Sequence, residues 1–106
     1  MRDSSFEEGG KMVVGVLRLT LYLDESHSLK EKRAILRKIK ARVRNEFNVS
    51  IAECGDQDLW QKTQLGLCQV GNDQAYISGA LQAAVRFIEN LHLAQVGGEE
   101  VEFLHY

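Results

Sequence analysis

The chain has 106 residues, of which 44% are hydrophobic and 26% are charged, which is the composition of a single globular domain. A chain of this length buries a core without needing disulfides or a structural metal. The net charge of −2 excludes a uniformly basic protein, but residues 28–47 carry eight basic and two acidic side chains, so the remainder sums to −8. Such an asymmetry favours a directional binding surface.

No segment of the sequence predicts a membrane span or an export signal. The longest apolar stretch, residues 12–23, is interrupted by Arg18 and is too short to cross a bilayer. The first eleven residues, "MRDSSFEEGGK", lack the apolar core of a signal peptide. Cys54 and Cys68 are isolated and lack metal-ligand spacing, which is typical of free thiols. We therefore expect a cytoplasmic protein without a metal.

Residues 1–11 are polar, contain a Gly-Gly step and predict a disordered leader before one domain at residues 12–106. Residues 12–23 alternate as a strand does. One face of this strand carries Leu17, Leu19, Leu21 and Leu23, and the other carries Val16, Arg18, Thr20 and Tyr22. The first predicted element is thus a strand with one strongly apolar face.

Residues 28–47 predict a helix. Ser28 and Glu31 form a capping box, in which each side chain accepts a hydrogen bond from a free backbone N–H at the helix start. Asn48 is a suitable C-terminal stop because it tolerates a left-handed backbone. At 100° per residue, an apolar stripe gathers on one side: Ile35, Leu36, Ile39, Val43 and Phe47. Five cations spaced 3, 4, 3 and 4 line the side facing away: Lys30, Arg33, Arg37, Lys40 and Arg44.

The second half of the chain predicts a hairpin, a helix and a final strand. "VSIAEC" and "KTQLGLCQV" are short strands joined by the turn-rich "GDQDLWQ". Asn72 or Asp73 caps the second helix, in which Gly79 suggests close packing. A "GG" loop then leads to the strand "EEVEFLHY". The order β-α-β-β-α-β predicts an α+β ferredoxin-like sandwich, a four-stranded antiparallel sheet with two helices on one face.

Four stretches carry a family resemblance: "SLKEKR", "FNVSIAE", "GDQDLWQ" and "VGND". The chain resembles the YlxP-like family, which consists of small bacterial proteins of unknown function. The resemblance implies the same ferredoxin-like fold. Because members are often encoded beside translation and ribosome-maturation genes, it also implies contact with RNA or the ribosome. The family has no known catalytic residues, so none is carried over.

The basic row of the first helix, defined by Lys30, Arg33, Arg37, Lys40 and Arg44, has two interpretations. It is either a solvated helix face or a surface that neutralises the phosphates of a nucleic acid. Interspersed acidic partners are few, and Lys30 and Lys32 lie in the first turn, where the helix dipole disfavours cations. Lys32 projects toward the apolar side, so we expect its ammonium group to reach back to the helix edge.

The loop "GDQDLWQ" offers two further candidates. Glu53, Asp56 and Asp58 could hold Mg²⁺ or Ca²⁺, but this spacing is also that of an ordinary turn, which we favour. Trp60 is expected to bury the hairpin end against the sheet, with a partner-binding anchor as the alternative. The three histidines show no common spacing. The sequence predicts no catalytic residue and no cofactor.

The sheet face opposite the helices is predicted to be partly apolar. It carries Val14, Val16, Tyr22, Ala52, Cys68, Leu104 and Tyr106. The aromatic motif of ferredoxin-like RNA readers is absent, so this face favours a homodimer formed through Val16, Tyr22 and Leu104. The sequence thus predicts a non-enzymatic RNA- or ribosome-associated accessory protein. The alternative is a dimeric protein-interaction module with no nucleic-acid role, using Trp60.

Overall fold

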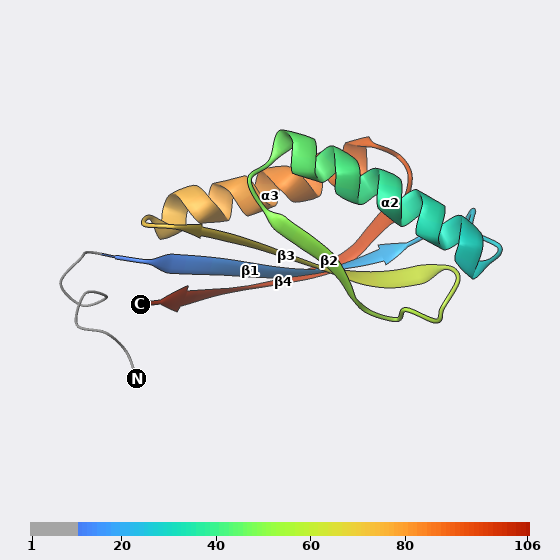
Figure 1. The fold of residues 1–106 in the computed structure, drawn as a ribbon, viewed down its shortest axis with the longest axis horizontal. Coiled ribbons are helices and arrows are strands. Elements are labelled where there is room, and N and C mark those ends of the chain that lie inside the picture. The colour runs from blue at the N-terminus through green and yellow to red at the C-terminus, as the bar shows by residue number, and fades with distance from the viewer. Residues whose placement is uncertain (1–10) are drawn as a thin grey trace.

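Four strands and two helices follow one another in the order predicted from the sequence (Figure 1). The structure, a computed structural model, describes residues 11–106, and the rest of the predicted leader lies outside this part of the chain. The elements are β1 (Val13–Tyr22), α2 (Leu29–Glu46), β2 (Ser50–Gly55), β3 (Lys62–Gly71), α3 (Gln74–Asn90) and β4 (Gln95–His105). Neither of these helices combines the length and the apolar character that a membrane crossing requires.

The strands form one sheet in the order β2-β3-β1-β4, and each neighbouring pair is antiparallel. Both helices cover the same face of the sheet, and the opposite face is left open (Figure 1). This arrangement is the predicted α+β fold and is consistent with a ferredoxin-like sandwich. The core lies between the sheet and the helices, where the odd-numbered residues of β1 and β3 meet the apolar stripes of α2 and α3. Phe47 and Phe87 join the two helices edge to face, with ring centroids 5.5 Å apart.

Helix α2 begins as predicted but ends earlier. The Ser28 hydroxyl accepts a hydrogen bond from the Glu31 N–H at 3.1 Å. The Glu31 carboxylate accepts one from the His27 N–H at 2.6 Å, one residue before the partner that a capping box predicts. The C-cap is Phe47, in an extended conformation with φ −132°. The prediction that Asn48 ends the helix in a left-handed conformation was therefore wrong. The chain is already extended at Phe47 and continues directly toward β2.

Close packing of α3 occurs at Gly15 in β1 and not at Gly79, where the sequence suggested it. A Cβ atom on Gly15 would overlap the Ile77 side chain of α3 and lie 3.0 Å from Leu81 Cδ1. A Cβ atom on Gly79 would meet nothing within 4 Å. The missing side chain at Gly15 therefore lets α3 approach the sheet.

Because their surroundings differ, substitution of these two glycines by alanine is expected to change the free energy of unfolding in opposite directions. Gly79→Ala is expected to raise the free energy of unfolding by about 0.4–1 kcal/mol, because alanine restricts the unfolded chain and favours a helix. Gly15→Ala is expected to lower it by about 1–3 kcal/mol through overpacking against Ile77. Urea unfolding monitored by circular dichroism measures both changes. A loss of stability in Gly79→Ala would contradict the open environment of this glycine.

Strand β4 is longer than predicted because the expected Gly-Gly loop is part of it. The strand begins at Gln95, and Gly97 and Gly98 lie within it, beside an irregularity in the pairing with β1 between Thr20 and Leu21. A Cβ atom on Gly97 would overlap the ring of Tyr22. The glycine therefore lets this ring lie flat over the edge strand, which positions Tyr22 at one end of the open sheet face.

Candidate functional site

The basic row runs along the flank of α2 that lies next to β2. Lys30, Arg33 and Arg37 are exposed, whereas Lys40 is half-buried. Arg44 is exposed, but its guanidinium group donates a hydrogen bond from Nη2 to the Ile51 carbonyl of β2 at 3.1 Å. This contact fixes the rotation of α2 about its axis. The basic row therefore lies closer to the edge of the sheet than it would if it faced directly away from the core. Three of the five predicted cations, Lys30, Arg33 and Arg37, are therefore exposed and make no salt bridge within residues 11–106.

The remaining exposed cations of α2 lie on a different flank. At 100° per residue, Lys38 and Arg42 are rotated by roughly 140° from the basic row. Glu31 and Glu46 share this second flank, so there the charges have mixed sign. Among its charged side chains, the flank next to β2 carries cations alone.

Lys32 is buried and connects α2 to the hairpin. Its side chain is 1% exposed, and Nζ lies 3.0 Å from Glu53 Oε2 of β2. The same Nζ donates a hydrogen bond to the Asp56 carbonyl at 2.6 Å, and Glu53 Oε2 also accepts one from the Thr63 hydroxyl at 2.6 Å. The expectation that Lys32 reaches the helix edge was wrong, because the chain supplies a carboxylate and a carbonyl for the ammonium group inside.

The carboxylates considered as metal ligands make structural contacts. Glu53 pairs with Lys32, and Asp56 Oδ2 accepts a hydrogen bond from Gln64 Nε2 at 3.1 Å and lies 3.7 Å from Lys62 Nζ. Asp56 also has a positive φ of 56°, as a tight turn requires. Within residues 11–106, no group of three or more His, Cys, Asp or Glu side chains is arranged to hold a metal ion. These contacts support the turn interpretation of "GDQDLWQ".

Trp60 is exposed beside the start of α2. Gln61 Nε2 donates hydrogen bonds to the Asp24 carbonyl at 3.2 Å and to the Ser26 carbonyl at 3.0 Å, two residues before the cap of α2. These bonds hold the loop against the segment that leads into the helix, and Trp60 remains 55% exposed. The expectation that Trp60 buries the hairpin end was wrong, because Gln61 and the Lys32 contact fasten the loop instead.

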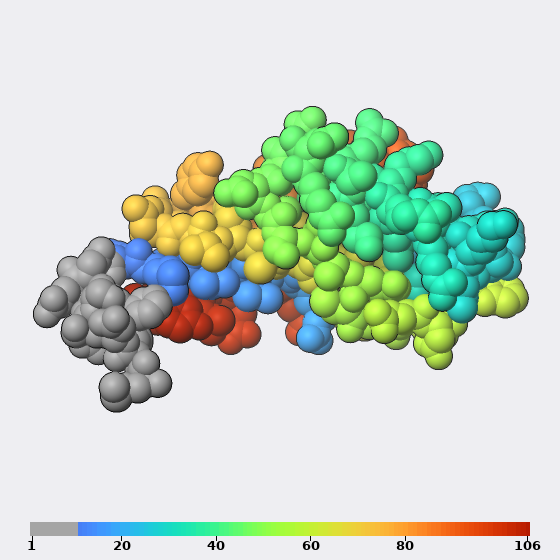
Figure 2. Space-filling model, in the orientation of Figure 1, coloured from blue at the N-terminus to red at the C-terminus, as the bar shows by residue number. Residues whose placement is uncertain are grey.

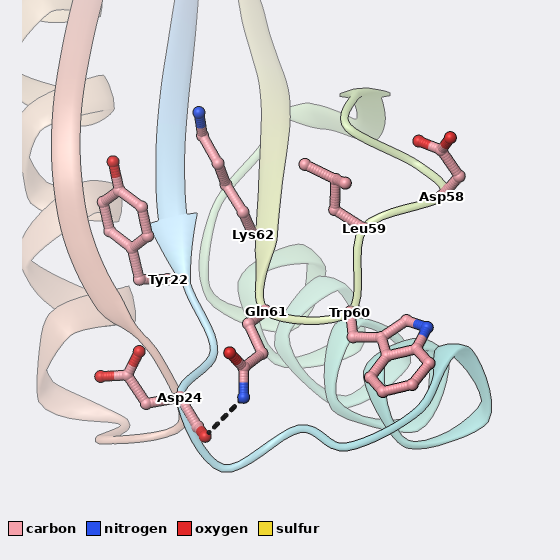
Figure 3. Close-up of a pocket in the computed structure, with 7 residues that line it drawn as sticks. All are labelled: Tyr22, Asp24, Asp58, Leu59, Trp60, Gln61 and Lys62. Carbon is pink, nitrogen blue, oxygen red and sulfur yellow. Dashed lines mark hydrogen bonds between the residues drawn. The ribbon is translucent and has the colours of Figure 1, made fainter.

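A shallow hollow of about 540 Å³ lies between this loop and the ends of β1 and β3 (Figure 3). It is lined by Tyr22, Asp24, Asp58, Leu59, Trp60, Gln61 and Lys62. Tyr22 and Lys62 are cross-strand partners at the ends of β1 and β3, and Figure 3 shows the indole of Trp60 pointing away from both. The lining carries two carboxylates, Asp24 and Asp58, and one cation, Lys62, so the formal charge of the hollow is negative whereas that of the basic row is positive.

An apolar patch occupies the opposite end of the open sheet face. Val70, Val14 and Leu104 lie side by side on β3, β1 and β4, and Val16 follows on the same face. Leu104 is 40% exposed and Val70, which the sequence analysis did not include, is 60% exposed. Tyr22 lies six residues beyond Val16 on β1, roughly 20 Å away. The structure thus places Val16 and Leu104 together and separates Tyr22 from them.

Comparison with known proteins identifies the family. A family described as "Protein of unknown function (DUF503)" matches residues 14–100. The chain belongs to this family. It is also similar to the "Uncharacterized protein YlxP" of Bacillus subtilis (strain 168), with 40% identity over 78 residues that cover 74% of this chain and 85% of that protein. The predicted resemblance to YlxP-like proteins is confirmed.

One solved structure shares the fold at low sequence identity. A structural-genomics protein, YJCS, superposes with a TM-score of 0.51 and 10% identity over 84% of this chain and 96% of its own. The designed protein Foldit4 gives a TM-score of 0.44 with 18% identity, over 90% of this chain and 96% of its own. The first similarity concerns the fold alone and transfers no ligand or activity.

Proposed function

We propose that this protein is a non-enzymatic accessory protein that binds RNA, free or within the ribosome, along the flank of α2 next to β2. The observation that carries this proposal is the set of exposed cations Lys30, Arg33 and Arg37 on one flank. Among residues 11–106, none of the three lies within 4.0 Å of a carboxylate. Their charge is therefore available to an external anion.

The dimensions of the row suit a polyanion better than a small anion. Consecutive members are three or four residues apart, so the row from Lys30 to Arg44 extends about 21 Å along the helix axis. A nucleic-acid strand carries one phosphate per roughly 3.4 Å of axis, so about six phosphates fit along this length. Figure 2 shows α2 as one continuous outer surface, with the segment after β2 directly beneath its N-terminal half. A strand following the row would meet no intervening element.

The salt dependence of RNA binding tests the proposal. Three phosphate contacts predict a slope of about −2 to −3 for log K against log[salt], measured by fluorescence anisotropy with a structured RNA. Arg33→Ala and Arg37→Ala are each expected to weaken binding and to reduce the slope by nearly one. Lys38→Ala and Arg42→Ala are the matched controls, because they remove the same charge from the other flank. Equal losses from both pairs, or no binding at low salt, would contradict a site on this flank.

The open sheet face favours a second function, self-association through the apolar patch. A second copy suits this surface because charges of both signs adjoin the patch: Arg18 lies beside Glu100 in the β1–β4 pairing, and Glu102 lies beside Val16. A two-fold arrangement can then place Arg18 of each copy near acidic side chains of the other. The patch lies on the face of the sheet opposite the helices, so a dimer would leave the basic row accessible (Figure 1).

A further inference from the structure

An exposed aromatic side chain stands at one end of the basic row. Arg44, at the C-terminal end of the row, donates a hydrogen bond to the Ile51 carbonyl of β2. Near the other end of the row, the buried Lys32 donates one to the Asp56 carbonyl, at the start of the loop after β2. Trp60 lies in this loop, directly before Gln61, which bonds the chain two residues before the cap of α2. The Trp60 loop and the start of α2, which carries Lys30 and Arg33, therefore lie at the same end of the molecule, although they come from separate parts of the sequence (Figure 1).

The loop that presents Trp60 is held at both of its ends. At its start, the Asp56 carbonyl accepts the hydrogen bond from Lys32 Nζ, and at its end Gln61 bonds the chain before α2. In addition, the Leu23 N–H donates to the Gln61 carbonyl at 2.9 Å. A large apolar ring held in solvent by a fastened loop is preorganised for a ligand, because little loop entropy is lost on binding.

The charge distribution decides on which side of the loop a polyanion lies. The hollow is lined by two carboxylates, Asp24 and Asp58, and by one cation, Lys62, so its formal charge is negative and disfavours phosphates. On the side of α2, Lys30 and Arg33 attract them. Trp60 lies at the edge of the hollow, and its indole points away from Tyr22 and Lys62 (Figure 3), so the ring is exposed at this edge.

We propose that Trp60 stacks on an unpaired base of single-stranded RNA whose phosphates follow Lys30, Arg33 and Arg37. This inference rests on the proposed function and specifies its substrate class, because aromatic rings beside cationic grooves bind single strands through the exposed faces of their bases. Bases paired within a duplex are already stacked and cannot cover the indole. The protein therefore prefers single strands to duplexes of the same length.

The tryptophan itself reports the contact, because Trp60 is the only one in the chain. Titration with a dodecameric oligouridylate at low salt is expected to quench the intrinsic fluorescence, whereas a duplex RNA of equal length leaves it nearly unchanged. Trp60→Ala is expected to weaken binding of the single strand by about 5- to 150-fold, the equivalent of one stacked base. Binding of the duplex, measured by anisotropy, is expected to stay the same. Trp60→Phe keeps an aromatic face and recovers part of the loss.

Leu59→Ala is the matched control, because Leu59 is 44% exposed in the same loop but its side chain points toward Lys62, whereas the indole points away from it (Figure 3). It is expected to leave single-strand affinity unchanged, and circular dichroism checks that all variants fold. If the wild type binds RNA and Trp60→Ala binds it equally well, the stacking inference is wrong. The proposed RNA site on the basic row would still stand. If neither form of RNA binds, the proposed function fails and the inference fails with it. A loss in Leu59→Ala equal to that in Trp60→Ala would also overturn the stacking geometry.

Discussion

Lys32→Ala is expected to lower the free energy of unfolding by about 3 kcal/mol. This value is the lower end of the range of about 3–5 kcal/mol that is typical of removing one partner of a buried ion pair. The substitution removes the cation that neutralises Glu53, whose side chain is only 18% exposed, and the donor that satisfies the Asp56 carbonyl. A partly buried carboxylate without a partner costs far more than a lost surface charge. Residual solvent contact at Glu53 moderates the effect. Urea unfolding monitored by circular dichroism measures it.

Two variants separate this effect from a general loss of positive charge. Lys30→Ala removes an exposed lysine two residues earlier and is expected to change stability by less than about 0.5 kcal/mol. Lys32→Met combined with Glu53→Gln removes both charges, keeps an acceptor for the Thr63 hydroxyl and is expected to recover most of the lost stability. If Lys32→Ala is no less stable than Lys30→Ala, the ion pair does not hold the helix to the hairpin.

The fold could be predicted from the sequence because its determinants are local. The alternation of Leu17, Leu19 and Leu21 defines the buried face of β1, and the Ser28 cap defines the start of α2. The Gly-Gly step of β4 was misassigned as a loop because its role depends on the Tyr22 ring, more than seventy residues earlier. Distant partners of this kind leave no periodic pattern in the sequence.

The candidate site could be predicted only in part, for the same reason. The spacing from Lys30 to Arg44 correctly indicates a cationic flank on α2, but it does not fix the rotation of the helix on the sheet. That rotation depends on Lys32 entering the core and on Arg44 reaching the Ile51 carbonyl. The exposure of Trp60 likewise depends on hydrogen bonds of Gln61, which no local pattern indicates.

Leu104→Glu is expected to convert a dimer into a monomer if the apolar patch joins two copies. In a two-fold dimer each substitution acts twice, so a loss of about 2–4 kcal/mol weakens association by roughly 30- to 1000-fold. The new carboxylate would lie beside Val14, on the same face of β4 as Glu102, which adds like-charge repulsion to the loss of apolar contact. Sedimentation velocity at tens of micromolar protein, where even micromolar affinity is visible, measures the change.

Val101→Glu is the matched control for this experiment. Val101 belongs to the same strand and is 48% exposed, but it is paired with Leu17 on the helix side of the sheet. It is therefore expected to leave the dimer intact, whereas a general effect of acidic charge on β4 would dissociate both variants. Leu104→Glu is also expected to leave RNA affinity per chain unchanged, because α2 lies on the other face. A wild-type protein that sediments as a monomer at this concentration excludes the dimer and leaves the basic row as the remaining functional surface.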